Sequence, residues 1–247
     1  MQATIILIHG ATLNGASWAP VRRHLEPRWR VLAPDLPGHG SRRGERFTLE
    51  GAVETVAAAV REAAPAPVIL AGDSLGGYTA QAAAASLPQD RLKGLVLGGA
   101  SSDFHGVKLW PHVLKAWMFR AMFAVTDERK LVAKKMPGLL RGEFGMNEED
   151  AQATLDAGVC LSVFPQALSA LHGVDFRGRL EKITQPTVFV NGDRDRFCVR
   201  SEAAYVAAAR DAEVHRFLDC EHGVSMRRSV AYAGLVDRLA QRVFVEP

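Results

Sequence analysis

Six short apolar runs recur along the chain, each bounded by residues that favour turns. Polar and apolar positions do not alternate within these runs, which is the pattern of strands buried on both faces of a parallel sheet. The predicted strands are Thr4–Ile8, Arg30–Ala33, Val68–Ala71, Leu92–Leu97, Thr187–Val190 and Glu213–Phe217.

Most of these runs are separated by stretches with helical periodicity, in which apolar residues return every three or four positions. The predicted helices are Ser17–Glu26, Leu49–Ala64, Leu75–Ser86, Ser201–Arg210 and Ser225–Phe244. Alternation of strand and helix predicts an α/β fold, with a mostly parallel six-stranded sheet and helices on both of its faces.

One interval between two predicted strands is too long to hold only a single helix. Between Gly98 and Thr187 lie residues 99–186, whereas a single crossover needs only about a dozen residues. Within it, Asn147 precedes three acidic residues, which is typical of a helix N-terminus. We therefore predict a helical lid at residues 101–177, inserted after the fourth strand, in a core formed by residues 1–100 and 178–247.

Large apolar residues follow helical spacing in the first part of this lid. Packing within the lid or onto the core explains any one of them, yet a lid over a site usually contributes some side chains to its pocket. We therefore expect an apolar pocket for an acyl or aromatic group, with Trp110, Trp117, Met118, Met122 and Phe123 as candidate lining residues.

Composition narrows the possible partners. The chain has 247 residues, 48% of them hydrophobic, and a formal net charge of +3. Its basic residues are scattered, so nucleic acid is not expected as a partner. The apolar run before His9 is too short for a signal peptide, and no stretch approaches a membrane span. We expect a cytoplasmic protein; its oligomeric state is not indicated.

Three cysteines at wide spacing, Cys160, Cys198 and Cys220, do not indicate a disulfide framework. A pair formed by Cys220 and His222 is conceivable as a metal site, but nothing completes a four-ligand zinc pattern. We expect buried, unreactive thiols, and neither a metal nor a cofactor.

The segment Gly72-Asp73-Ser74-Leu75-Gly76 follows a predicted strand and opens a predicted helix. In this context the pattern G-x-S-x-G forms a nucleophile elbow, which lifts the serine hydroxyl out of the chain. Glycine or another very small residue is needed two positions before and after the serine, because the strand and helix backbones pass close together. Ser74 is therefore a candidate nucleophile; the alternative is a serine that only caps the helix.

A serine nucleophile needs a base, and the base needs an orienting group. Of the eight histidines, His222 lies in the loop after the last strand, at the edge of the sheet where Ser74 emerges. For the acid we choose Asp195, after the fifth strand. Asp193 is the reserve, because the first acid of such a turn more often caps its own loop, and Asp103 is a third candidate.

The oxyanion of acyl transfer needs preorganised N–H donors. The backbone N–H of Leu75, at the start of the helix after Ser74, is one candidate. The loop after the first strand places Ala11 beside Gly10, and its N–H is the second candidate.

The segments HGATLNGASW, PDLPGHGSR, GDSLGG, NGDRDRF and EHG occur in this order over the whole chain, which resembles the α/β-hydrolase fold superfamily. The resemblance is to its compact members, among them small esterases and hydroxynitrile lyases. It implies the strand order 2-1-3-4-5-6, the triad Ser74, Asp195 and His222, and an oxyanion hole at Ala11 and Leu75. One departure is Asp73, where many relatives carry histidine.

The sequence thus predicts a cofactor-free serine hydrolase that cleaves a small-molecule ester, thioester or lactone through an acyl-enzyme. Two alternatives stay open. One is a carbon–carbon hydrolase or a hydroxynitrile-type lyase with the same triad, and the other is a non-catalytic small-molecule receptor on the same fold.

Overall fold

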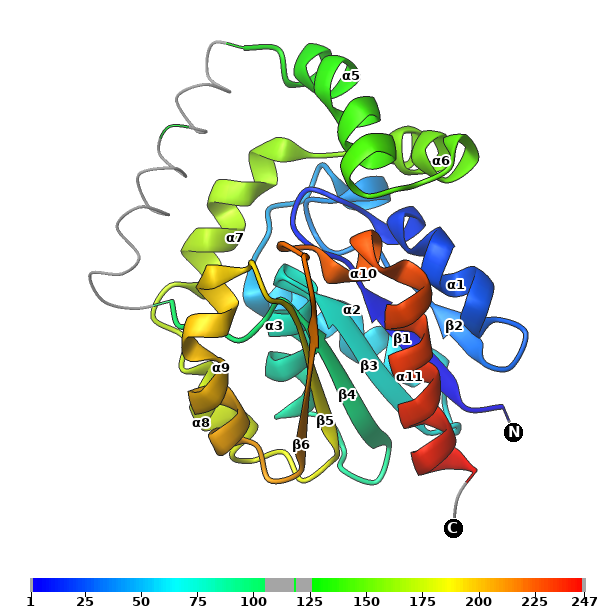
Figure 1. The fold of residues 1–247 in the computed structure, drawn as a ribbon, viewed down its shortest axis with the longest axis vertical. Helices are drawn as coiled ribbons and strands as arrows, with labels where there is room; N and C mark the ends of the chain where they lie inside the picture. The colour runs from blue at the N-terminus through cyan, green and yellow to red at the C-terminus, as the bar shows by residue number, and fades with distance from the viewer. Residues whose placement is uncertain (1, 105–117, 119–125, 246–247) are drawn as a thin grey trace.

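The computed structural model describes residues 2–104, 118 and 126–245, and in them six parallel strands form one sheet (Figure 1). The order is β2-β1-β3-β4-β5-β6, as predicted. The strands are β1 (Thr4–Ile8), β2 (Arg30–Leu32), β3 (Val68–Asp73), β4 (Leu92–Gly98), β5 (Thr187–Gly192) and β6 (Ala212–Phe217).

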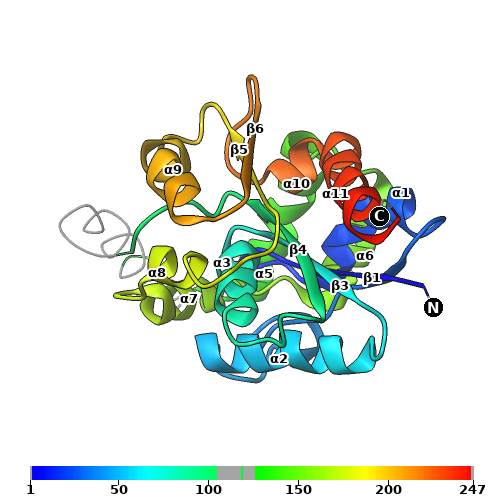
Figure 2. The same cartoon turned by 90° about the horizontal axis from the view of Figure 1, so that it is seen from below.

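Helices cover both faces of the sheet (Figure 2). On one face lie α1 (Ala19–Leu25), which follows the short helix η1 (Gly15–Trp18), and α11 (Ser229–Phe244). The other face carries α2 (Leu49–Glu62), α3 (Leu75–Ala84) and α9 (Arg196–Ala208). The short helices η2 (Gly40–Arg42) and α10 (Val224–Arg227) lie in loops after β2 and β6.

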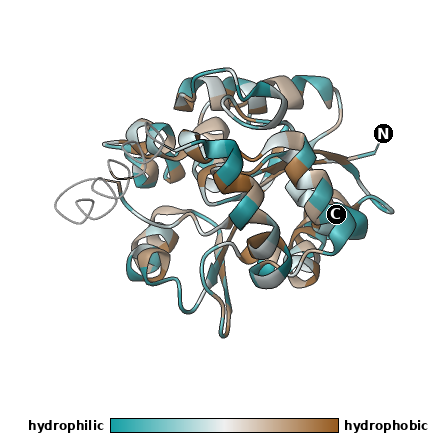
Figure 3. Ribbon diagram, turned by 90° about the horizontal axis from the view of Figure 1, so that it is seen from above, coloured by the Kyte–Doolittle hydropathy of each residue, from teal (hydrophilic) through white to brown (hydrophobic). Residues whose placement is uncertain are grey.

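Burial on both faces explains why the strands read as continuous apolar runs. In β1, Ile5 and Leu7 pack under α1 and α11, whereas Ile6 and Ile8 pack toward α2 and α3. In Figure 3 the outer helices carry both hydrophobic and hydrophilic colour, as expected of helices with one face on a core.

The last strand departs from this pattern. β6 was predicted as fully buried, but Glu213, Val214 and Arg216 are exposed. As an edge strand, β6 has a neighbour on one side only and its faces are only partly covered. The prediction of a buried strand is therefore wrong here, although the strand itself is present.

Between β4 and β5, the described helices are α5 (Glu128–Gly138), η4 (Leu139–Glu143), α6 (Glu148–Gly158), η5 (Leu161–Val163), α7 (Phe164–Leu171) and α8 (Phe176–Leu180). Asn147 Oδ1 accepts a hydrogen bond from the Asp150 N–H at 2.7 Å, which confirms the predicted start of α6. α5 and α6 lie beyond the carboxyl ends of the strands (Figure 1). The predicted domain boundary at residues 101–177 stays a prediction.

No single helix in the described ranges is long and apolar enough to cross a membrane. One bent pair, α6 with the segment Leu161–Leu171, meets the length and composition criteria together, with an angle of 63° between its halves.

Candidate active site

Ser74 stands at a sharp turn between β3 and α3. Its backbone has a positive φ of +54° with ψ −118°, a strained conformation for a residue with a side chain. A Cβ on Gly76 would lie 1.9 Å from the Ile8 carbonyl oxygen, and one on Gly72 would lie 2.3 Å from the Gly76 oxygen. Only glycine fits at these two positions, as the sequence predicted.

Ser74 is the N-cap residue of α3, but its side chain makes no capping hydrogen bond. Its Oγ lies 2.8 Å from Nε2 of His222. On the other side of the ring, His222 Nδ1 lies 2.6 Å from Oδ2 of Asp195. Three loops at the carboxyl edge, after β3, β5 and β6, thus bring the three predicted side chains into one hydrogen-bonded chain.

The two other candidate acids lie elsewhere. Asp193 Oδ1 accepts a hydrogen bond from the Cys220 N–H at 3.2 Å, so this side chain holds the loop backbone. Asp103 forms an ion pair with Arg177, with 3.1 Å between Oδ1 and Nε. Of the three carboxylates, it is Asp195 that contacts the histidine.

The Asp195 and His222 side chains shift each other's pKa values in opposite directions. Burial raises the pKa of the Asp195 carboxyl, but the hydrogen bond with His222, the charge of His222 and the hydrogen bonds from Cys198 together bring this pKa below its ordinary value. Burial lowers the pKa of His222, yet the hydrogen bond to Asp195 and the neighbouring Cys198 raise it well above 6.5. A carboxylate that favours the imidazolium is what a base needs while it holds a proton.

The two amides expected to face an oxyanion lie beside Ser74. Ala11 and Leu75 both line the cavity that contains the Ser74 side chain. A Cβ on Gly10 would lie 3.6 Å from the Cβ of Ser74, so the loop after β1 runs next to the hydroxyl. Within the described ranges, neither the Ala11 N–H nor the Leu75 N–H donates to another backbone group.

A hydrogen bond of the His9 side chain supports the loop after β1. This side chain is buried, and its Nε2 accepts a hydrogen bond from the Leu36 N–H at 3.0 Å. Burial lowers the pKa of His9, in keeping with a neutral ring that accepts at this nitrogen. The contact ties the Ala11 loop to the turn after β2.

The cavity above Ser74 has a volume of about 330 Å³. Its lining is mostly apolar and comes from the segment after β4, from α7 and from α9: Phe104, Phe164, Ala167, Leu168, Leu171 and Phe197. A larger and more open groove of about 960 Å³ lies on the other side of α7, between residues 43–50 and α7. That groove is polar and does not include Ser74, so the smaller cavity is the candidate site.

The predicted pocket residues need separate mention. Trp110, Trp117, Met122 and Phe123 lie outside the described residues. Met118 is 64% exposed and is not among the described residues that line the cavity. Its role in the pocket stays a prediction.

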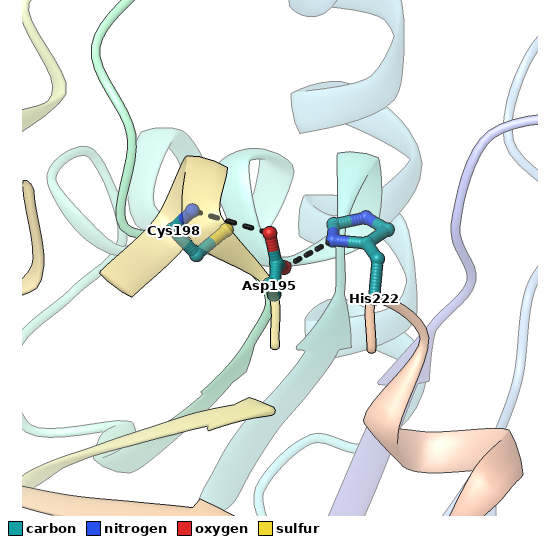
Figure 4. Close-up of side chains that lie close together, drawn as sticks. All are labelled: Asp195, Cys198 and His222. Carbon is teal, nitrogen blue, oxygen red and sulfur yellow. Dashed lines mark hydrogen bonds and ion pairs between the residues drawn. The ribbon is translucent and has the colours of Figure 1, made fainter. Parts of the chain in front are cut away.

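Sequence reasoning did not identify three features of this site. A Cβ on Gly99, where φ is +55°, would lie 2.9 Å from Cε1 of His222, so this glycine makes room for the ring. Cys198 lies beside Asp195 and His222 (Figure 4). Ser225 Oγ donates to Asp73 Oδ2 at 2.8 Å behind Ser74. The position of Gly99 directly after β4 was a usable signal, whereas the sequence held no signal for the two side-chain pairings.

The chain resembles known proteins along most of its length. Residues 5–235 match the alpha/beta hydrolase family. The pimeloyl-[acyl-carrier protein] methyl ester esterase of Stenotrophomonas maltophilia is 32% identical over 230 residues, covering 89% of this chain and 84% of that protein.

Solved structures give the same fold. An esterase from Thermogutta terrifontis, with malate bound, has a TM-score of 0.76 at 20% identity, covering 98% of this chain and 90% of that one. A bromoperoxidase from Bacillus anthracis has a TM-score of 0.78 at 21% identity, covering 98% and 92%. At these identities the likeness shows the fold alone.

Proposed function

The chain belongs to the alpha/beta hydrolase family and is an ester-cleaving serine hydrolase, and we propose that Ser74, His222 and Asp195 perform its reaction through an acyl-enzyme. The observation that carries the proposal is the hydrogen-bonded chain from Ser74 Oγ to His222 Nε2 and from His222 Nδ1 to Asp195. His222 is the base that the Ser74 hydroxyl needs, and Asp195 is the counter-charge that the imidazolium of His222 needs.

The reaction would proceed in two steps. Ser74 Oγ attacks the ester carbonyl while Nε2 of His222 takes its proton, and Asp195 stabilises the imidazolium that forms. His222 then returns the proton to the departing alcohol. A water attacks the acyl-enzyme by the same proton transfer and releases the acid. The N–H groups of Ala11 and Leu75 would hold the oxyanion of both tetrahedral intermediates.

The cavity favours an uncharged substrate. Of the residues that line it, Asp195 and His222 are the ionisable ones near neutral pH, and they pair with one another. The rest of the lining is aromatic and aliphatic, so burying a charged acyl group there would lack compensation. We propose an ester of a neutral apolar or aromatic group, and a methyl ester of an acyl chain, the bond named for the 32% identical relative, is the first to test.

The Ser74→Ala variant tests the nucleophile. We expect turnover of p-nitrophenyl butyrate to fall on the order of 10⁶-fold, because the remaining groups have nothing to activate. The matched control is Ser86→Ala just beyond the carboxyl end of α3, where the hydroxyl donates to the Ala83 carbonyl. Activity of Ser74→Ala within tenfold of the unmodified protein would refute the assignment.

The choice of acid is tested by amide substitution. Asp195→Asn is expected to lose about 10⁴-fold in kcat, because the amide no longer holds the histidine in the required tautomer. Asp103→Asn and Asp193→Asn are expected to stay within a few-fold, since their carboxylates contact other groups. A large loss of kcat in Asp103→Asn, with kcat retained in Asp195→Asn, would show that a different acid orients the base.

A fluorophosphonate separates a competent nucleophile from an inert scaffold. We expect it to label Ser74 and to stop ester turnover in proportion to labelling. Labelling of a protein that cleaves none of the esters would instead favour a lyase that uses the same triad, and no labelling would favour a receptor.

A further inference from the structure

A thiol lies next to the proposed acid and base. Cys198 stands in the first turn of α9, whose N-cap is Asp195, and its N–H donates to Asp195 Oδ1 at 3.2 Å. One ligand atom each from Asp195, Cys198 and His222 lies within 4.8 Å of the others (Figure 4). In the described ranges no other group of three such side chains lies this close.

Sulfur, imidazole nitrogen and carboxylate oxygen together form the donor set of zinc sites with an open position. Hard cations such as Mg²⁺ and Ca²⁺ prefer oxygen ligands alone. Around Zn²⁺, bonds of about 2.0–2.3 Å place tetrahedral ligands about 3.5 Å apart. The 2.6 Å contact between His222 and Asp195 would have to lengthen to reach this separation. The Cys198 sulfur lies within 4.8 Å of both other ligand atoms, so it needs to move little.

We propose that Asp195, Cys198 and His222 form an inhibitory site for a thiophilic divalent cation, with Zn²⁺ as the biological ion. Binding of the ion follows from the side chains alone. Inhibition rests on the proposed role of His222 as the base.

The inhibition has a defined chemical cause. An ion bound at Nδ1 of His222 excludes the hydrogen from that nitrogen, so the ring proton moves to Nε2. Nε2 then donates instead of accepting and has no lone pair for the Ser74 proton. The thiol releases its own proton to solvent when sulfur binds the ion. The same ion takes the Asp195 carboxylate away from the ring.

Among the described residues, the two other cysteines belong to no such group of three. Cys220 Sγ lies 3.5 Å from the Glu221 carbonyl oxygen, and Cys160 Sγ lies 3.6 Å from the Ser162 hydroxyl. Cys198 is fully buried, so an ion would reach it through the cavity that Asp195 and His222 line. A substrate in that cavity should therefore compete with the ion.

Binding is measured first, in a protein that needs no activity. The Ser74→Ala variant is titrated with Cd²⁺, followed by calorimetry and by the ultraviolet absorption of the metal–thiolate bond. We expect one ion per chain with thiolate absorption, and loss of both when Cys198→Ser is added. Cys160→Ser is the control and should retain both. Equal Cd²⁺ binding with and without Cys198, or no binding, would overturn the proposal.

Inhibition is measured next, with Zn²⁺ on the otherwise unmodified enzyme and p-nitrophenyl butyrate as substrate. Each variant is compared with its own metal-free rate. Half-inhibition should need at least tenfold more Zn²⁺ in Cys198→Ser and in Cys198→Ala, no more in Cys160→Ser, and Mg²⁺ should have no effect. Equal Zn²⁺ sensitivity in the Cys198 variants would overturn the site, and Cd²⁺ binding with undiminished turnover would overturn its inhibitory role. A protein that binds Cd²⁺ as expected but cleaves no ester would instead contradict the proposed function.

Discussion

At the scale of single residues, Asp73 is a carboxylic acid in an environment very different from water. It precedes Ser74 and is 2% exposed. Its Oδ2 accepts a hydrogen bond from Ser225 Oγ, and in the described ranges Oδ1 has no partner. Its pKa is raised to about 6, and the largest cause is burial. The charge of His222 and the hydrogen bond from Ser225 act to lower this pKa, and the charge of Asp195 acts to raise it.

This raised pKa makes a prediction about stability. Because the folded carboxyl binds its proton more tightly than the unfolded one, its contribution to stability is greatest at low pH and is lost as pH rises through about 6. Between pH 4.5 and 7 this loss amounts to about 2 kcal/mol. The free energy of unfolding of the wild type, measured in urea relative to Asp73→Asn, should fall by that amount over this range.

Ser225→Ala provides a second variant for the same effect. Removal of the hydroxyl takes away a hydrogen bond that lowers the pKa of Asp73, so the fall in the free energy of unfolding should become larger and extend to higher pH. Parallel unfolding profiles for the wild type and Asp73→Asn across this range would contradict the argument.

At the scale of elements, α6 is joined to the loop that carries Ala11. The buried Asn14 side chain donates from Nδ2 to the Thr154 and Gly158 carbonyls at 2.8 and 3.1 Å. Its Oδ1 accepts from the Ala16 N–H at 3.1 Å, and the Cys160 N–H donates to the Thr12 carbonyl at 2.9 Å. The lid helix and the proposed oxyanion loop therefore hold one another in place.

Asn14→Ala should disturb both elements. It leaves two buried carbonyls without their donor, at about 1–3 kcal/mol each, and frees the loop after β1. We expect a lower free energy of unfolding in urea and a tenfold or greater fall in kcat for p-nitrophenyl butyrate. Asn147→Ala is the matched control, because it removes only the cap of the same helix and should cost about 1 kcal/mol with kcat nearly unchanged. Equal losses of kcat in the two variants would mean that the tie does not act on the loop.

At the scale of the whole molecule, α7 separates two cavities that differ in polarity. Leu168 faces the apolar cavity above Ser74, and Ser169, the next residue, lines the polar groove on the other side. The apolar cavity is completed by Phe104 and Phe197, which come from distant parts of the chain. The size of the acyl group accepted is therefore a property of how these parts pack.

Leu168→Trp should shorten the acyl chains that the protein accepts. The larger side chain fills part of the 330 Å³ cavity, so kcat/KM for p-nitrophenyl hexanoate should fall at least tenfold more than that for the acetate. Ser169→Trp places the same indole side chain on the opposite face of α7 and should leave the ratio unchanged. A similar change in both variants would place the acyl group outside this cavity.

Local patterns predicted the elements well where a strand or helix has a self-contained signal. The observed bounds of β1 match the predicted ones, and the observed bounds of β3, β4 and β5 differ from the predicted ones by one or two residues at their carboxyl ends. α9 begins at Arg196, five residues before the predicted start, because the carboxylate of Asp195 caps it through the Cys198 N–H. The helical hydrogen bonds of α9 therefore begin at a residue before the one where its apolar periodicity becomes visible in the sequence.

The sequence by itself determined the α/β class, the parallel sheet and its order, and the residues that meet at its carboxyl edge. It did so because continuous apolar runs, the glycines of the elbow and the chain order of Ser74, Asp195 and His222 are local or topological signals, whereas the strand order followed from the resemblance to a known family. Only the tertiary structure decided which carboxylate faces the histidine, that Cys198 lies against that pair, and that Asp73 contacts Ser225. These contacts join side chains far apart in the chain, and their partners are set by loop geometry and packing, which leave no periodic trace in the sequence.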